Sequence, residues 1–205
     1  MGDDVFFDVD GTLHGGDLFK DYLRHLARTR PLRLALTWPL VVTALLCYLL
    51  RPHGRRSLGF LLWTLTLGLS EAALQRGTQR CLSAFWMRCE RHPAVWAAVE
   101  RHLARGDRVW LVSGSPECLL RGLYRRFDDD PRARIIGSRM VPFLGGQVLA
   151  MHCISLEKAR QLDLRAQREV TFRAGYSDSA QDMPLLSRCR RAYKVERAGR
   201  ITRWH

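Results

Sequence analysis

The stretch DVFFDVDGTL, residues 4–13, decides how this chain is expected to fold. Its apolar start predicts a short buried strand over 4–8. Two aspartates, Asp8 and Asp10, lie where this strand ends, and Gly11 allows the backbone to turn sharply after them. The sequence therefore predicts a buried strand that ends in an acidic turn.

Helices and strands alternate from Pro93 to the end of the chain. A strand over 108–112 is expected to end at Ser113-Gly114-Ser115, directly before a helix. Such alternation favours an open parallel sheet with helices on both faces. The other expected helices cover 93–105, 116–127, about 155–164 and a short turn from 182, and the other strands lie near 134–150, 170–175, 192–195 and 200–204.

The segment between these two regions differs from them in composition. Asp17 predicts the N-cap of a helix that runs to about residue 28. Two runs without a charged residue follow, 17 residues over 34–50 and 14 residues over 57–70, and an arginine-containing turn separates them. An amphipathic helix is expected over 71–90. The predicted plan is a split α/β core with a helical insertion, the core covering 1–14 and 91–205 and the insertion 15–90.

Four segments carry polar residues suited to phosphate chemistry, at strand ends or helix starts. Open α/β sheets bind ligands at the carboxyl ends of their strands. Hydroxyl and N–H groups before a helix suit a phosphate, and a lysine supplies a point positive charge. Each segment alone has a plainer explanation as a turn, a loop or a helix cap, but their order and placement together predict one site. The four hold Asp8 with Asp10, Ser113 to Ser115, Lys158, and Asp178 with Asp182.

The overall composition excludes some classes of protein. Of the 205 residues, 47% are apolar and 26% are charged, which excludes a chain disordered throughout. The formal charge of +13 predicts attraction to nucleic acid, an anionic lipid surface or a phosphorylated substrate, although arginine-biased coding explains it equally well. The six cysteines form no CxxC pair and no zinc-ligand spacing, and the first residues lack the basic segment of a signal peptide. We expect reduced thiols on the cytoplasmic side.

The four polar segments resemble the four motifs of the haloacid dehalogenase-like phosphohydrolases, in order and in spacing. The insertion after the first motif resembles the helical cap of that superfamily, which implies a Rossmann-like α/β core. Within the superfamily, the chain is similar to the phosphatidylglycerophosphatase C family of Gram-negative bacteria over nearly its whole length. The likeness is carried by FFDVDGTLHGGDL (6–18), LLW (61–63) with SEA (70–72), VWLVSGSP (109–116) and GYSDSAQDMPLL (175–186).

The resemblance implies a phosphatase that forms a covalent aspartyl-phosphate. Asp8 would be the nucleophile, and Asp10 would protonate the leaving oxygen and later take a proton from water. Mg²⁺ would be held by Asp8, Asp178, the main-chain carbonyl of Asp10 and waters.

The resemblance also assigns the groups that bind the phosphate. Ser113, Gly114 and Lys158 would hold the phosphoryl oxygens, and Asp182 would support Lys158 or a metal-bound water. The implied reaction converts phosphatidylglycerol phosphate and water into phosphatidylglycerol and phosphate.

Some residues depart from the family pattern or stay open. The last motif reads Tyr-Ser-Asp-Ser where relatives commonly show Gly-Asp-Gly or Gly-Asp-Ser, so the role of Asp178 rests on its four-residue spacing to Asp182. Asp17 lies where serine-phosphate phosphatases carry a glutamate, and the helix-cap interpretation stands beside that one. His14 is expected to be an exposed turn residue, with contact to the site as the alternative.

The two apolar runs suggest a membrane-associating hairpin over about 34–70. As helices they span roughly 26 Å and 21 Å, less than the ~30 Å hydrocarbon core. Because Asp8 precedes them and Ser113, Lys158 and Asp178 follow them, the chain crosses a bilayer either twice or not at all. Two crossings would carry the arginines of the 51–56 turn to the far side, against the positive-inside rule. We therefore expect a hairpin embedded in one leaflet.

This hairpin predicts attachment to the bacterial inner membrane, with the catalytic core on the cytoplasmic side. The membrane surface and an anionic phospholipid substrate are the expected partners. Trp38 and Trp63 suit the interface, and nearby basic residues suit anionic headgroups. These basic residues are Arg24, Arg28, Arg30, Arg33 and the arginines of 51–56. The alternative is a soluble helical cap whose apolar runs form its own core.

Two other functions remain open. One is a phosphatase that acts on soluble, phosphoserine-like monoesters. The other is a non-catalytic module that binds membrane or RNA through its basic surface, although it would not need to retain Asp8, Asp10, Lys158 and Asp178. We expect no nucleic-acid partner, and the sequence leaves the oligomeric state open.

Overall fold

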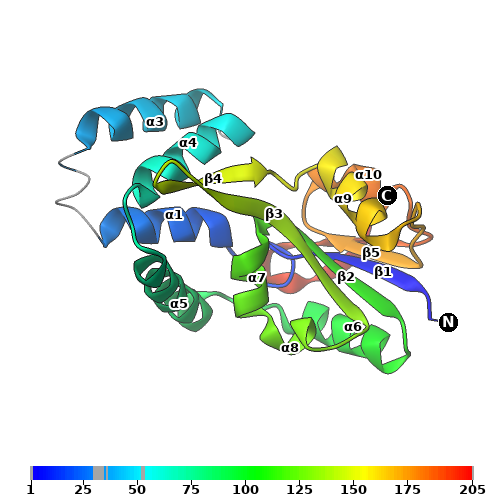
Figure 1. Ribbon diagram of the computed structural model, residues 1–205. Helices are drawn as coiled ribbons and strands as arrows, with labels where there is room; N and C mark the ends of the chain where they lie inside the picture. The colour runs from blue at the N-terminus through cyan, green and yellow to red at the C-terminus, as the bar shows by residue number, and fades with distance from the viewer. Residues whose placement is uncertain (1, 30–34, 36, 52–53, 205) are drawn as a thin grey trace. The chain divides into compact units, whose positions relative to one another are not determined.

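The computed structural model describes residues 2–29, 35, 37–51 and 54–204 (Figure 1). Its contacts divide the chain into two compact units, which we call unit 1 and unit 2. Unit 1 comprises Met1–Asp17, Arg88–Gly137 and Cys153–His205, and unit 2 comprises Leu18–Met87 and Ser138–His152. The first two boundaries lie within three residues of those predicted at 14/15 and 90/91. Residues 138–152, which were expected in the core, group with unit 2 instead.

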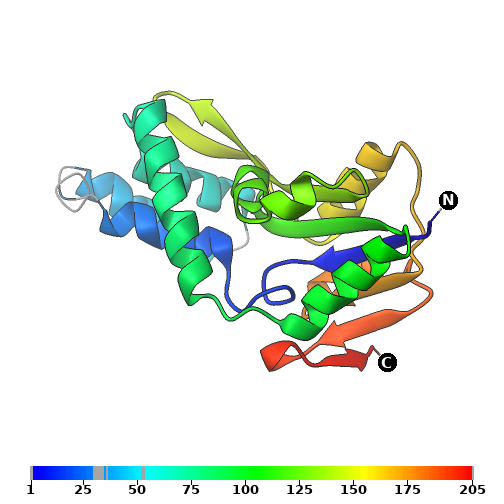
Figure 2. The ribbon, with the colours of Figure 1, turned by 90° about the horizontal axis from the view of Figure 1, so that it is seen from below.

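The sheet of unit 1 has its earliest strand in the middle. Strand β1 (Asp4–Asp8) pairs in parallel with β2 (Arg108–Pro116) on one side and with β5 (Ala174–Ser177) on the other. Figure 2 shows β1 between these two later strands. All five residues of β1 are buried. The carboxyl ends of the three strands therefore meet at one edge of the sheet.

The outer strands make the sheet mixed rather than all parallel, which corrects the prediction. Strand β6 (Ala192–Val195) pairs in parallel with β5, but β7 (Ile201–Arg203) pairs antiparallel with β6. The connection from β6 to β7 is too short for the crossover that a parallel pair needs. On the other side of β2, β3 (Ala133–Phe143) begins in unit 1 and continues into unit 2.

The helices of unit 1 pack on this sheet. Helices α6, α7 and α9 contact β2, and α10 contacts β5. The helix expected over 116–127 is divided at Tyr124. The strand expected over 170–175 begins only at Ala174, and the Val170 N–H bonds the Asp163 carboxylate of α9. The helix bounds are α6 (Pro93–Ala104), α7 (Glu117–Leu123), α8 (Arg125–Asp128), α9 (Leu156–Ala166) and α10 (Met183–Leu186).

The described part of the predicted insertion, 15–90, contains helices as its regular elements, but unit 2 also includes a β-hairpin from the region expected in the core. Strand β3 turns into β4 (Gly146–Met151) through a two-residue loop, Leu144-Gly145, whose φ values of 41° and 75° suit a tight hairpin. Helix α4 packs against β4, and the Gln147 N–H donates to Thr66 Oγ1 over 2.7 Å. The helices are α1 (Leu18–Arg28), α3 (Trp38–Leu50), α4 (Arg55–Thr66) and α5 (Glu71–Arg88).

The two apolar runs have different surroundings. In α4, Leu58, Leu62 and Leu65 are buried. Helix α3 buries only Ala44 and exposes most of its other side chains, with Leu50 80% exposed. Only the first run therefore presents a broad apolar surface, and its association with a membrane stays a prediction.

Among the described residues, no single helix has the length and apolar character of a membrane span. Helices α4 and α5 meet that criterion only together, as a pair bent by 109°. Within the predicted hairpin and its arginine cluster, residues 34, 36, 52 and 53 and the arginines Arg30 and Arg33 lie outside the described residues.

Candidate active site

Asp8, Lys158 and Asp182 form a buried charged cluster at the carboxyl edge of the unit 1 sheet. Asp8 ends β1, Lys158 lies in the first turn of α9, and Asp182 ends a short 3-10 turn after β5. The Lys158 Nζ lies 2.6 Å from Asp8 Oδ1 and 2.7 Å from Asp182 Oδ1. One ammonium group thus bridges two carboxylates, one of them on the predicted nucleophile.

Burial and charge shift the pKa values of this cluster. Burial raises the pKa of Asp8 well above its ordinary value; Lys158 lowers it, and the carboxylates of Asp182 and Asp178 raise it further. Burial lowers the pKa of Lys158, but its two carboxylate partners more than offset this, so its pKa is raised. Lys158 is therefore charged at neutral pH. Because the carboxylates outnumber it, the site favours a further cation.

Asp182 has a second contact besides Lys158. The Ser177 hydroxyl donates a hydrogen bond to Asp182 Oδ2 over 2.7 Å, so both carboxylate oxygens of Asp182 are engaged. This arrangement fits the predicted role of supporting Lys158. Asp17 is half-buried directly before α1, and both interpretations of that residue stay open.

Thr12 connects the first motif to the last one. Its hydroxyl is within donating distance of Asp178 Oδ1 (3.2 Å) and of Asp8 Oδ2 (3.4 Å), and it accepts the Asp178 N–H over 3.0 Å. Asp8 and Asp178 therefore lie around one buried oxygen atom although 170 positions separate them. Thr12 was not among the residues predicted from the sequence to form the site.

Gly11 allows the Asp178 carboxylate to lie close to the backbone of the first motif. Its φ is +82°, and a Cβ atom there would lie only 2.3 Å from Asp178 Oδ2. A side chain at this position would meet both unfavourable backbone geometry and the Asp178 carboxylate. Glycine therefore lets the Asp178 carboxylate, a predicted metal ligand, approach the backbone of the first motif closely.

The residues present fit a magnesium ion. Among the described residues, no three His, Cys, Asp or Glu side chains are grouped so as to hold a metal by themselves. The predicted set differs from such a group, since it joins Asp8 and Asp178 to the main-chain carbonyl of Asp10 and water. These hard oxygen ligands, the close approach of Asp178 to Gly11 and the excess of carboxylates over Lys158 suit Mg²⁺.

Asp10 and Ser113 contact each other at the same edge. The Ser113 hydroxyl donates to Asp10 Oδ2, and the Ser115 N–H donates to Ser113 Oγ over 2.9 Å. The segment expected as a loop belongs to β2, which extends to Pro116 and includes a half-buried Gly114. Ser113 lies at the site as predicted, but its hydroxyl proton points to the predicted acid–base group.

His14 is buried, which corrects the expectation of an exposed turn residue. Its side chain has no solvent exposure, and its ring is stacked with that of Tyr124 at a centroid distance of 6.0 Å. The His14 Nε2 lies 3.9 Å from Asp10 Oδ1. Burial lowers the pKa of His14, and Asp10 partly opposes this shift. The alternative that His14 approaches the site is therefore the correct one.

A family model of the haloacid dehalogenase-like hydrolases matches residues 5–187. The chain belongs to this family. The predicted family resemblance is confirmed, and so are the predictions of a phosphoric monoester hydrolase and of Mg²⁺ as its cofactor.

Solved structures share the fold of this family member. A protein of unknown function from Bordetella pertussis Tohama I has a TM-score of 0.69 and 19% identity, over 94% of this chain and 89% of that one. A substrate-bound phosphoserine phosphatase has a TM-score of 0.55 and 11% identity, over 94% and 85%. A phospho-aspartyl intermediate analogue of phosphoserine phosphatase gives 0.53 and 13%, over 93% and 85%. At these identities the likeness concerns the fold, and the finer resemblance to the phosphatidylglycerophosphatase C family stays a prediction.

Proposed function

We propose that this hydrolase cleaves phosphate monoesters through an aspartyl-phosphate on Asp8. The observation that carries the proposal is the contact of Asp8 with Lys158 over 2.6 Å, in a buried cluster that Thr12 links to Asp178. A nucleophile, a fixed positive charge and a second carboxylate for the metal lie at one strand edge. These are the groups that phosphoryl transfer to a carboxylate requires.

The chain's own residues account for both halves of the reaction. A carboxylate oxygen of Asp8 attacks phosphorus, and the bond from phosphorus to the ester oxygen breaks. Asp10, whose side chain is 18% exposed, gives its proton to the leaving oxygen. Asp10 then takes a proton from the water that attacks the aspartyl-phosphate, which releases phosphate and restores Asp8.

Two positive charges favour the attack of one anion on another. Lys158 stays charged and neutralises part of the negative charge on the phosphoryl oxygens. Bound Mg²⁺ would supply the rest of the positive charge, held by Asp8, Asp178 and the main-chain carbonyl of Asp10. Ser113 and Gly114 lie where they can bind a phosphoryl oxygen, once the Ser113 hydroxyl turns from Asp10 to the substrate.

A small soluble monoester is the substrate class that the comparisons favour. Two of the similar structures are phosphoserine phosphatases, and the likeness covers more than 90% of this chain. It makes a phosphorylated amino acid or a compound of similar size the first substrate to test.

A lipid phosphate monoester is the second candidate, and helix α3 favours it. This helix exposes Trp38, Leu46 and Leu49 by 64%, 55% and 65%. A surface of this kind suits the boundary of a membrane. With phosphatidylglycerol phosphate as substrate, the enzyme would act on the cytoplasmic face of a bacterial inner membrane.

A substrate panel tests the proposal. The enzyme with Mg²⁺ is given p-nitrophenyl phosphate, phosphoserine, and phosphatidylglycerol phosphate and phosphatidic acid in mixed micelles, and phosphate release is measured. Preference for phosphoserine supports the soluble class, and preference for a lipid in micelles supports the second candidate. Acid-quenched enzyme should carry the phosphate on Asp8 by mass spectrometry. A phosphate on another residue would contradict the mechanism with either substrate.

A further inference from the structure

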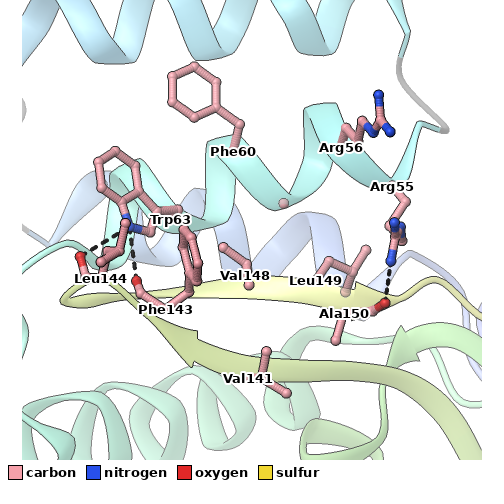
Figure 3. Close-up of a pocket in the computed structure, with 11 residues that line it drawn as sticks. Arg55, Arg56, Phe60, Trp63, Val141, Phe143, Leu144, Val148, Leu149 and Ala150 are labelled. Atoms are coloured by element: carbon pink, nitrogen blue, oxygen red, sulfur yellow. Dashed lines mark hydrogen bonds between the residues drawn. The ribbon is translucent and has the colours of Figure 1, made fainter.

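Unit 2 contains a groove that takes no part in the chemistry at Asp8. It lies between helix α4 and the β3–β4 hairpin and has a volume of about 540 Å³ (Figure 3). This volume is within the about 300–1,000 Å³ of small-molecule sites. Its wall is largely apolar and includes Phe60, Trp63, Val141, Val148 and Leu149.

The two ends of the groove differ in chemistry. Arg55 and Arg56 lie at one end, and Trp63 and Leu144 lie at the other (Figure 3). The Trp63 indole N–H donates to the Phe143 carbonyl over 3.1 Å, and Arg55 Nη1 donates to the Ala150 carbonyl over 2.6 Å. Hydrogen bonds thus attach α4 to the hairpin at both ends, while apolar side chains line the middle.

The charge around the groove has one sign. Among the described residues that line it, the charged ones are Arg55 and Arg56. In the sequence, no aspartate or glutamate occurs between Asp21 and Glu71. An occupant that complements these features has an apolar chain and an anionic head.

The surface beside the groove indicates where such an occupant comes from. Helix α3 packs on α4 and exposes Leu46 and Leu49, and at the hairpin Phe143 and Leu144 are 54% and 74% exposed. Exposed apolar side chains on two elements, together with arginines, suit an anionic bilayer surface. Because α3 has 13 residues, it is about 20 Å long and fits along such a surface.

We propose that this groove binds one acyl chain of an anionic phospholipid taken from a bilayer. The chain lies along Val148 and Leu149 toward Trp63, and the headgroup lies at Arg56. Lipid binding here involves no hydrolysis, so it holds whichever ester the enzyme cleaves.

Gly59 provides a way to fill the groove. It lies on α4 in the groove wall, and a Cβ atom there would lie 3.4 Å from the Leu149 N and 3.7 Å from its Cβ. Gly59→Leu therefore places a side chain where the acyl chain would lie, and Gly59→Ala does so in part. Both changes favour the helix, since glycine is a weak helix former. Gly77→Leu on α5 is the matched control, because a Cβ atom there has no neighbour within 4 Å.

The experiment uses vesicles of phosphatidylcholine with and without phosphatidylglycerol. We expect the full chain to bind the anionic vesicles, Gly59→Leu to bind them about tenfold more weakly, Gly59→Ala to lie between, and Gly77→Leu to bind like the parent. Arg56→Glu should weaken binding more than Arg80→Glu, which makes the same charge change on α5. Brominated acyl chains should quench parent fluorescence more than that of Trp63→Phe.

Several results would overturn the inference. One is equal vesicle binding by Gly59→Leu and the parent. Another is fluorescence quenching that does not depend on Trp63. A third is a dimer of the chain that Gly59→Leu dissociates, which would mean that a second copy covers the groove. The Asp8→Asn variant separates this inference from the proposed function. Asp8→Asn should bind vesicles like the parent. If the parent itself does not bind vesicles, the lipid-binding inference fails but the chemistry proposed at Asp8 is unaffected.

Discussion

The catalytic cluster of unit 1 buries ionisable side chains, whereas the apolar surface of unit 2 exposes leucines, and both arrangements are the reverse of what is usual in a folded protein. Asp8 and Lys158 are ionisable and buried, whereas Leu49 and Leu50 are apolar and exposed. Desolvating an ion costs several kcal/mol, and leaving a leucine exposed forgoes about 1.5–3 kcal/mol. In unit 1 the chain itself supplies the compensating partners. In unit 2 the described residues leave α3 largely uncovered, which is why we assign binding to that surface and chemistry to the cluster.

Asp8→Asn tests the cluster with the largest expected effect. The amide cannot form the aspartyl-phosphate, so kcat for p-nitrophenyl phosphate should fall by ~10⁴-fold or more. Phosphate release with Mg²⁺ measures this, and circular dichroism checks that the variant is folded. A variant with the parent rate would show that Asp8 is not the nucleophile.

Asp10→Asn should reduce hydrolysis of alkyl phosphates by ~10²–10⁴-fold, because proton transfer to the leaving oxygen is lost. Nitrophenolate needs little protonation, so with p-nitrophenyl phosphate the first step should survive. Its product should then appear as a burst, since water attack on the aspartyl-phosphate still lacks a base. Rapid-mixing absorbance detects the burst, and equal losses on both esters without one would contradict the assignment.

One pair of leucine substitutions compares the two units directly. Leu111→Ala, in the buried β2 strand, should lower the free energy of unfolding by about 2–5 kcal/mol. Leu49→Ala, at a position 65% exposed on α3, should change it by less than about 0.5 kcal/mol. Urea unfolding measures both. A large loss for Leu49→Ala would mean that α3 packs within the protein and would remove the argument for a binding surface.

Gly11→Ala should weaken Mg²⁺ dependence and stability together. Positive φ costs an alanine about 1–3 kcal/mol, and its Cβ would contact the Asp178 carboxylate. Gly106→Ala is the matched control, since φ is +80° there and a Cβ atom has no neighbour within 4 Å. Both variants should lose stability, but only Gly11→Ala should need more Mg²⁺ for half-maximal activity. If both variants needed the same Mg²⁺ concentration for half-maximal activity, the proposed metal site beside Gly11 would be contradicted.

The smallest expected effect concerns two thiols. Burial raises the pKa of Cys153 in unit 1 to about 12, while Cys47 on α3 is exposed. An unfolded thiol ionises near pH 8.5, so Cys153 stabilises the fold fully below that pH and loses this contribution as pH rises toward 12. At pH 9 the loss is about 1 kcal/mol. Cys153→Ala should flatten the decline of the unfolding free energy at alkaline pH, and Cys47→Ala should not. If the two variants showed the same decline with pH, the raised pKa of Cys153 would be contradicted.

The sequence predicts the cluster well because its information is local. Asp8 and Asp10 follow a strongly apolar strand, and Lys158 starts a helix. Once strands β1, β2 and β5 are parallel neighbours, their carboxyl ends bring Asp8, Ser113 and Asp178 together without further information. This is why the predicted residues could be named before their contacts were known.

Other features depend on contacts between distant segments. The Ser113 bond to Asp10 and the stacking of Tyr124 on His14 each join residues more than 100 positions apart, and no local pattern encodes them. The place of the β3–β4 hairpin in unit 2 depends on its packing against α4. The burial of Leu62 and exposure of Leu49 likewise follow from tertiary contacts, since both lie in uncharged runs of similar composition.

The central position of β1 has a consequence for biosynthesis. Asp4 pairs with Arg108 and Val5 with Ala174, so β1 leaves the ribosome before both of its neighbours and is flanked on both sides only after β5 has been translated. Until then Phe6 and Phe7 lack their native neighbours and are a target for chaperones. Pairing across such sequence distances also slows folding. Truncated forms that end before β5 should therefore leave this phenylalanine pair unprotected and aggregate.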